Sequence, residues 1–360
     1  MKKILVVFAL ITSLVLTGCA SDSKSGTTTE EGKALIGISM PTKDLERWEK
    51  DGDAMKSAAE SKGYEVDIQY ANNDVATQVS HIENMITKGA KLILIAPIDG
   101  AALTDITKKA QEADIKIISY DRLITGTEAV DYYATFDLAT VGKIQGEYIE
   151  KALDLENQAG PFNIELFGGA PDDNNAPIFF KGAMDVLQKY IDSEKLVVKS
   201  NQTDFNQVAT QNWDGSKAQQ RMDNLLSANY TSDTVHAVLT QNDALARGVI
   251  SSLKSVGYGS DDLAMPVITG QDAETASVKA IASGEQAMTV FKDTSLLASA
   301  AIDMADAVLN GKEPTINDTE TFDNGKKVVP TYYLQPVPVD KENFQSVLVD
   351  SGYIDAADLQ

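Results

Sequence analysis

From Ala34 onward, short apolar runs alternate with amphipathic stretches of helical length, and this alternation limits the fold more than any other feature. Strands that take turns with helical segments are typical of a parallel sheet with crossover helices. In the first part of the chain we expect strands at residues 35–40, 66–70, 92–96 and 115–120, with helices at 44–61 and 75–88.

The same pattern occurs a second time, although the two halves share no repeated sequence. The strands expected in this second series are residues 163–167, 195–199, 235–240, 267–270 and 287–291, and the strand-like run 132–137 falls between the halves. A helix at 295–309, closed by Asn310-Gly311, would return to the first half, and 328–334 would cross once more. We therefore predict an α/β fold of two doubly wound parallel-sheet lobes, one formed by residues 34–136 and 293–328, the other by 137–292 and 329–360.

Residues 1–18 predict a signal peptide. Lys2 and Lys3 form a positive start, and the apolar run that follows is shorter than the ~20 residues that cross a bilayer. Leu16-Thr17-Gly18-Cys19 resembles the lipobox of bacterial lipoproteins, so we predict that Cys19 is acylated. An ordinary cleavage-site residue is the alternative, but Cys19 is the only cysteine and stands where lipidation requires it. Residues 19–33 would then be the acylated cysteine and a flexible tether.

The charge of the chain argues against two classes of partner. Its formal net charge is −22, whereas nucleic acids and anionic lipid surfaces are bound through clustered cations. A lone cysteine also excludes an intramolecular disulfide, so stability must come from a sizeable core.

Polar residues collect just after the expected strands. In open parallel sheets, ligands bind beyond the carboxyl ends of the strands, where loops and helix N-termini converge. The residues found there are Asp121-Arg122, Asp172-Asp173-Asn174-Asn175, Asn242-Asp243, Asp272 and Lys292. Carboxylates, amides and cations together suit the hydroxyl groups of a neutral polyol. Trp48 and Trp213, the only tryptophans, stand in polar segments and would cover the apolar face of a sugar ring.

Each of these residues also has a simpler interpretation. Asp44, Asp243 and Asp272 fit helix N-caps, and Asp121 with Arg122 fits a surface ion pair. The run 172–175 between Pro171 and Pro177 fits a solvated turn, and either tryptophan fits ordinary packing. The convergence of several such residues at strand ends in both halves favours the binding site.

Several segments together carry a resemblance to a known family. They are Glu46-Arg47-Trp48, Ile82-Glu83-Asn84-Met85-Ile86, Ser119-Tyr120-Asp121-Arg122, Phe162-Asn163-Ile164-Glu165-Leu166-Phe167-Gly168-Gly169, Asp172-Asp173-Asn174-Asn175, Arg221-Met222-Asp223-Asn224-Leu225-Leu226-Ser227-Ala228 and Gly270-Gln271-Asp272-Ala273. From about Leu35 to the C-terminus, the chain resembles the pentose and hexose branch of the periplasmic solute-binding proteins, which includes the xylose-binding and multiple-sugar-binding receptors.

The resemblance implies a type I periplasmic binding protein fold, with two lobes joined by a three-segment hinge and one aldopyranose enclosed between them. Carried over residue by residue, it implies hydrogen bonding to the sugar by Arg47, Asp121, Arg122, Asp173, Asn175, Asn242, Asp272 and Lys292, with Trp48 and Trp213 stacked on its two faces. At position 242, asparagine resembles the xylose receptor more than the multiple-sugar-binding receptor, so the range of sugars stays open. The lipobox departs from freely periplasmic relatives and indicates a single-membrane envelope.

The expected partner is the permease of an ABC importer, with a chemotaxis or two-component sensor as the alternative output. The receptor would be an exported monomer, held at the outer face of the membrane by its lipid alone, with no cofactor, metal or nucleic acid. A glycoside-cleaving enzyme is a further alternative, but adjacent Asp172 and Asp173 would point apart, and no catalytic motif singles out an acid and its base. His81 and His236 are interpreted as structural. A sugar-responsive repressor would need a DNA-binding module where the signal peptide stands.

Overall fold

The structure is a computed structural model and describes residues 33–360, so the predicted signal peptide, Cys19 and the tether up to Gly32 lie outside the described residues. The first of two large sheets has six strands in the order β11-β5-β4-β3-β1-β2, all parallel. Its strands are β1 (Leu35–Met40), β2 (Glu65–Tyr70), β3 (Leu92–Ile95), β4 (Lys116–Tyr120), β5 (Tyr132–Phe136) and β11 (Thr331–Leu334).

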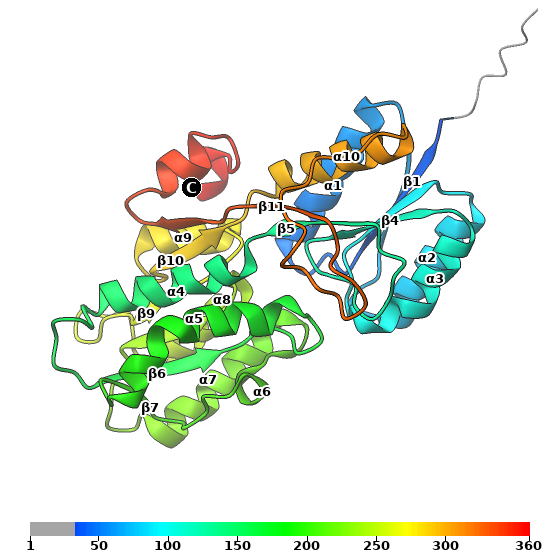
Figure 1. The fold of residues 1–360 in the computed structure, drawn as a ribbon. Helices are drawn as coiled ribbons and strands as arrows, with labels where there is room; N and C mark the ends of the chain where they lie inside the picture. Colours follow the sequence, from blue (N-terminus) through cyan, green and yellow to red (C-terminus); the bar gives the residue numbers. More distant parts are fainter. Residues whose placement is uncertain (1–32) are drawn as a thin grey trace, which may run out of the picture. The chain divides into compact units, whose positions relative to one another are not determined.

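Helices cover both faces of this sheet (Figure 1). They are α1 (Glu46–Ser61), α2 (Val75–Thr87), α3 (Thr104–Glu112) and α10 (Thr294–Leu309). Leu92 and Leu94 of β3 belong to the buried cluster that includes residues of α1 and α10, whereas Ile93 and Ile95 belong to the cluster that includes residues of α2 and α3. Successive side chains of a strand point to opposite faces, so a continuous apolar run is what a doubly covered strand requires.

The second large sheet repeats the arrangement with four parallel strands in the order β7-β6-β8-β9. These are β6 (Phe162–Phe167), β7 (Leu196–Val198), β8 (Ala237–Thr240) and β9 (Val267–Ile268). The helices of this part, in chain order, are α4 (Leu138–Ala152), α5 (Asn175–Asp192), α6 (Phe205–Val208), α7 (Gly215–Asn229), α8 (Asp243–Ser255) and α9 (Thr275–Ser283). A separate antiparallel pair consists of β10 (Met288–Phe291) and β12 (Val337–Asp340).

Both parallel sheets have a switch point. The strand order reverses between β1 and β3 in the first sheet and between β6 and β8 in the second. The loops that leave neighbouring strands there run to opposite faces of the sheet, which opens a crevice at the carboxyl ends. The fold therefore provides two crevices, one for each sheet.

One predicted lobe limit is wrong. We expected residues from 329 onward in the second lobe, but β11 lies in the first sheet, with Thr331 to Leu334 beside Tyr133 to Phe136. The pairing ends before Pro336, which has no amide hydrogen to continue the ladder. The chain crosses after Leu334 and reaches β12 at Val337.

The chain crosses between the two parts at two other points. β5 ends at Phe136 in the first sheet, and α4 packs on α5; β10 ends at Phe291, and α10 packs on α1. That these crossings act as a hinge stays a prediction.

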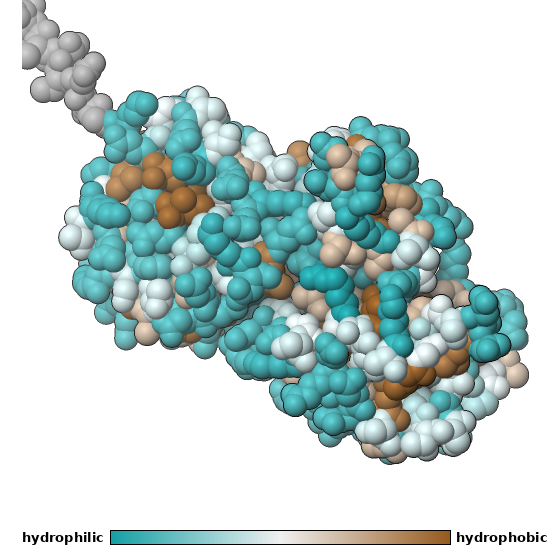
Figure 2. All heavy atoms as spheres, turned by 180° about the vertical axis from the view of Figure 1, so that it is seen from behind, coloured by the Kyte–Doolittle hydropathy of each residue, from teal (hydrophilic) through white to brown (hydrophobic). Residues whose placement is uncertain are grey.

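The surface of the described part is mainly hydrophilic. Hydrophilic residues cover most of the face seen in Figure 2, and apolar residues form smaller separate patches. Among residues 33–360, no helix combines the length and the apolar character needed to span a membrane.

Candidate functional site

All ten predicted ligand-binding residues line one cavity. They are Arg47, Trp48, Asp121, Arg122, Asp173, Asn175, Trp213, Asn242, Asp272 and Lys292. The strand ends place most of them: Asp121 and Arg122 follow β4, Asn242 follows β8, and Lys292 follows β10. The cavity is narrow, with a volume of about 20 Å³. Whether these residues bind a ligand stays a prediction.

Arg47 is the centre of the charge network. Its guanidinium lies 2.9 Å from a carboxylate oxygen of Asp121, 2.9 Å from one of Asp51 and 3.5 Å from one of Asp272. Arg47 and Asp121 come from the first lobe and Asp272 from the second, so this network crosses from one lobe to the other. The Arg47 side chain is only 3% exposed, and a charge so buried is tolerated only when it is paired.

Two further cations complete the set. Lys292 Nζ lies 3.0 Å from Asp272 and 3.8 Å from Asp121, and Arg122 Nε lies 2.8 Å from Asp173. None of these side chains is more than 8% exposed. The charged residues lining the cavity are therefore three cations and three carboxylates, which balance. A balanced lining suits a neutral ligand better than an ion.

The backbone adopts a rare conformation at three lining residues. Asp121, Asp272 and Trp213 have φ angles of 58°, 95° and 56°, in the left-handed region that non-glycine residues seldom occupy. Such conformations persist where surrounding contacts hold them. The carbonyl oxygen of Asp121 accepts hydrogen bonds from Tyr133 Oη at 2.6 Å, Thr135 Oγ1 at 2.9 Å and Asn175 Nδ2 at 2.8 Å. These bonds hold the Asp121 backbone in place.

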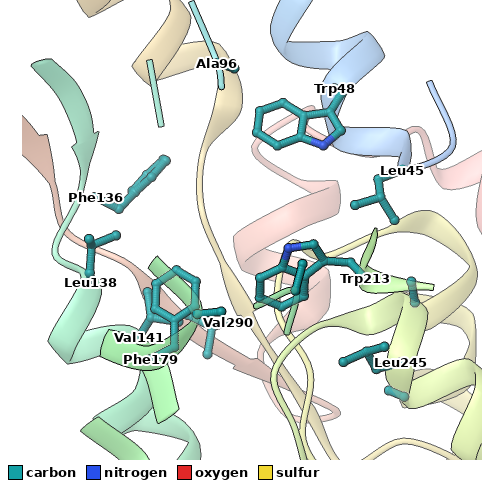
Figure 3. Close-up of a cluster of buried hydrophobic side chains, with 14 of the residues drawn as sticks. Leu45, Trp48, Ala96, Phe136, Leu138, Val141, Phe179, Trp213, Leu245 and Val290 are labelled. Carbon is teal, nitrogen blue, oxygen red and sulfur yellow. The ribbon is translucent and has the colours of Figure 1, made fainter. Parts of the chain in front are cut away.

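The two tryptophans project into the same region from different segments (Figure 3). Trp48 lies in α1 and Trp213 just before α7, and they are 1% and 4% exposed. A side chain at Gly169 would place its Cβ 2.0 Å from the Trp213 ring, so only glycine fits there. Trp213 Nε1 donates to Asp173 at 3.2 Å. The ring is therefore held from behind and along its edge.

Three neutral polar atoms of lining residues have no hydrogen-bond partner within residues 33–360. They are Trp48 Nε1, Asn175 Oδ1 and Gln271 Oε1. Buried polar atoms without a partner are uncommon and need an explanation. One donor and two acceptors at one cavity indicate a ligand that both accepts and donates hydrogen bonds.

The model of the periplasmic binding protein domain family matches residues 36–313, more than half of the chain. The chain belongs to this family. The predicted family and the predicted type I α/β fold are thereby confirmed, and the chain is a periplasmic binding protein in this sense.

Several relatives are similar along nearly their whole length. The multiple sugar-binding periplasmic protein of Azospirillum brasilense is 55% identical over 326 residues, which are 91% of each chain. The D-xylose-binding periplasmic protein of Escherichia coli (strain K12) is 37% identical over 348 residues, 97% of each chain. An ABC transporter solute-binding protein of Clostridium phytofermentans, solved with bound β-D-glucose, is 48% identical with a TM-score of 0.87 and covers 91% of this chain and 100% of its own.

The helix-cap interpretation is wrong for three aspartates. The N-caps of α1, α8 and α9 are Leu45, Asn242 and Glu274, not Asp44, Asp243 and Asp272. Asn242 caps α8 through its side chain, which accepts from Leu245 N at 3.0 Å, and it also lines the cavity of this binding protein.

His236 and Asp172, which do not line the cavity, have structural contacts. His236 Nδ1 accepts a hydrogen bond from Asn163 N at 2.9 Å. Asp172 accepts from Gln211 Nε2 at 2.9 Å, whereas Asp173 lies with Arg122. Within residues 33–360, no group of three or more His, Cys, Asp or Glu residues is placed to hold a metal ion.

Sequence reasoning missed three lining residues and two residues behind them. Leu45, Phe179 and Gln271 line the cavity. Gln271 stands beside Asp272 in a segment that the resemblance already included, so its position offered a signal; Leu45 and Phe179 are ordinary apolar residues and offered none. Asp51 and Tyr120 are fully buried behind Arg47: the Tyr120 hydroxyl donates to Asp51, which accepts from Arg47 Nε at 3.0 Å.

The carboxylates of this network differ in pKa. Burial acts to raise the pKa of Asp121, but Arg47, Lys292 and Arg122 outweigh it, and the pKa is lowered. Burial raises the pKa of Asp173 despite Arg122. Burial also raises the pKa of Asp51 to about 6, against the opposing effect of Arg47.

The raised pKa of Asp51 predicts a measurable pH dependence of stability. Between about pH 4 and 6 the folded chain holds a proton on Asp51 that the unfolded chain releases, so the contribution of Asp51 to stability falls as pH rises through this window. Asp51→Asn removes this titration. The free energy of unfolding of the variant minus that of wild type should therefore increase across the window, by on the order of 3 kcal/mol. Urea unfolding at several pH values measures it.

Asp53→Asn is the matched control for this experiment, because Asp53 is exposed on the same helix. The change with pH in the Asp51→Asn difference is compared with the change that Asp53→Asn shows. Equal pH dependence in the two variants would contradict the raised pKa of Asp51.

Proposed function

We propose that this binding protein holds one aldopyranose monosaccharide between its two lobes and delivers it to an ABC importer. The observation that carries the proposal is the balanced set of buried cations and carboxylates around one cavity, with two tryptophan rings beside it. Hydroxyl groups accept from arginine and lysine and donate to carboxylates, and the C–H face of a pyranose packs on an aromatic ring.

Binding would proceed by closure of the lobes on the sugar. Arg47 and Asp272, and likewise Arg122 and Asp173, are paired between the two lobes. A sugar that enters between them exchanges these ion pairs for hydrogen bonds to its hydroxyls, while closure excludes water. A sugar that lacks one of these hydroxyls leaves a buried charged group without a partner, which costs about 1–3 kcal/mol or more.

The names and bound ligands of the relatives support this choice of substrate. Two solute-binding proteins, from Clostridium phytofermentans and Chloroflexus aurantiacus, were solved with glucose. The relatives from Azospirillum brasilense and Escherichia coli are named for multiple sugars and for D-xylose. We infer a receptor for aldopentoses and aldohexoses. A membrane permease is the expected partner, and a sensor protein that reads the closed form is the alternative output.

We also propose that the receptor is exported, anchored by lipid at Cys19 and monomeric. The lipobox-like sequence and the polar segment after Cys19 support the anchor. The periplasmic relatives support export. Acylation would keep the receptor close to its permease and raise its effective concentration there.

We infer that the protein is not an enzyme. Each of the three carboxylates at the cavity lies next to an arginine or a lysine, which suits hydrogen bonding to a ligand. Hydrolysis of a glycoside needs an acid and a second carboxylate flanking the scissile bond. Incubation with pentose and hexose glycosides should yield no product.

A sugar screen tests the proposed function directly. Xylose, arabinose, glucose, galactose, fucose and ribose would be added to the purified protein, and the melting temperature measured. A sugar that binds only the folded state stabilises it by about 2.7 kcal/mol at 100 times its Kd. We expect the melting temperature to rise with at least one aldopyranose and to stay unchanged with amino acids or phosphate. Loss of that rise in Asp272→Ala, with the fold retained, would connect binding to this cavity; a wild-type protein that responds to none of these sugars contradicts the proposal.

Removal of the Trp48 ring should weaken binding. Trp48→Ala is expected to raise the Kd of each sugar that binds at least about tenfold, because the sugar loses an aromatic surface. Calorimetry measures the Kd. Tyr148→Ala on α4 removes a half-buried aromatic that does not line the cavity and should leave the Kd unchanged. Equal Kd values for Trp48→Ala and wild type would reject the stacking role.

The lipid anchor has its own test. In the cell, the full chain should fractionate with membranes, and Cys19→Ser should move it to the soluble fraction, because the thiol is the only acceptor for the lipid. Sugar affinity should not change. A wild-type chain found only in the soluble fraction contradicts the anchor without affecting the sugar site.

A further inference from the structure

Glu46 stands beside Arg47 in the segment that carries the resemblance, yet it does not line the cavity. Its carboxylate lies at the second lobe instead. Glu46 Oε2 accepts from Thr275 N at 3.0 Å, and Glu46 Oε1 accepts from Thr275 Oγ1 at 2.7 Å. Two residues 229 positions apart in the sequence are thus joined by two hydrogen bonds.

Thr275 is the first residue of α9, where the backbone amide has no acceptor within the helix. Glu274, the N-cap residue, makes no side-chain cap bond and lies in an ion pair with Arg247 instead. Glu46 therefore serves as the acceptor for α9 from the other lobe. A carboxylate at a helix N-terminus is also favoured by the helix dipole.

Glu46 and Arg47 both contact one turn of the second lobe, which runs from Asp272 to Thr275. Arg47 reaches Asp272, and Glu46 reaches Thr275, three residues later. The turn is held in its own lobe: Glu274 N donates to Asp243 Oδ2 at 2.9 Å, and Ala273 N donates to Thr289 Oγ1 at 3.2 Å. Because the turn is held in place, the approach of Arg47 to Asp272 also brings Glu46 to Thr275.

Lys50 positions Glu46 from within α1. Its Nζ lies 2.8 Å from Glu46 Oε1, one helical turn away, and 4.8 Å from the centre of the Tyr353 ring. Tyr353 packs on Phe291 of β10, with ring centres 4.5 Å apart. Partial burial acts to raise the pKa of Glu46, but Lys50 and Thr275 outweigh it and lower the pKa. The carboxylate is therefore ionised when it meets α9.

We propose that Glu46 and Thr275 form a latch that stabilises the closed lobes and so increases the affinity for every sugar the site accepts, without contacting the sugar. This role rests on the proposed function, because it presumes closure on a sugar. Substitution of a residue that contacts the ligand changes the ranking of the sugars by affinity. Loss of a latch changes the affinity for every sugar by the same factor.

The test compares Glu46→Ala, Thr275→Val and the double variant with wild type. In Glu46→Ala, the affinity for each bound sugar should fall about tenfold, and the ratios between sugars should be retained, because two hydrogen bonds to a charged acceptor are lost. Stopped-flow kinetics should place the change in the dissociation rate. Thr275→Val removes only the hydroxyl and should have a smaller effect. The double variant should be no weaker than Glu46→Ala, because both act on one contact.

Glu49→Ala is the matched control. Glu49 lies in the same helix and pairs with Lys43 at 2.9 Å, within the first lobe. Its loss should leave affinities and dissociation rates at the wild-type level. A Glu46→Ala variant that behaves like Glu49→Ala overturns the latch, and so does one that loses affinity for some sugars only. If wild type binds no sugar, the proposed function fails instead, so the two failures are distinguishable.

Discussion

The buried guanidinium of Arg47 is the constraint on which the rest of the site depends. An arginine with 3% exposure must be neutralised by carboxylates whose positions allow little error. Asp51 lies one turn further along α1, Asp121 follows β4, and Asp272 follows β9. Three segments from two lobes are therefore arranged around one side chain. Removal of any one carboxylate leaves a buried charge that the remaining groups compensate only in part.

Left-handed backbone at Asp121 and Asp272 follows from this arrangement. A residue in this conformation costs about 1–3 kcal/mol, and both of these aspartates share Lys292 and Arg47 as partners. The hydrogen bonds to the Asp121 carbonyl and the bond from Asp272 N to Val290 O at 2.9 Å offset that cost. Both carboxylates are thereby fixed by the sheets behind them, so the cavity is formed by groups that have little freedom to reorient.

Local pattern was sufficient for the strands and for the ends where polar residues meet. β1 was predicted with its observed bounds, and most others within one or two residues, because apolar runs bounded by polar turns are local signals. No local signal shows which lobe β11 joins. The run that contains Tyr332 and Tyr333 would fit a strand of either lobe, and only its pairing with β5 decides between them. Asp51 and Phe179 were missed for a related reason. Nothing next to them in the sequence distinguishes a helix residue that faces Arg47, or that lies beside Trp213, from one that packs in an ordinary core.

The pairing of charges across the cavity also bears on selectivity. Because the cations and carboxylates already satisfy one another, a ligand adds stability only by the amount that its own hydrogen bonds exceed the ion pairs it separates. Each ligand hydroxyl must therefore meet a group placed for it. An ionic ligand would leave one sign of charge in excess within the buried lining. A neutral polyol keeps the balance, and the positions of its hydroxyls decide how completely the separated charges are satisfied again.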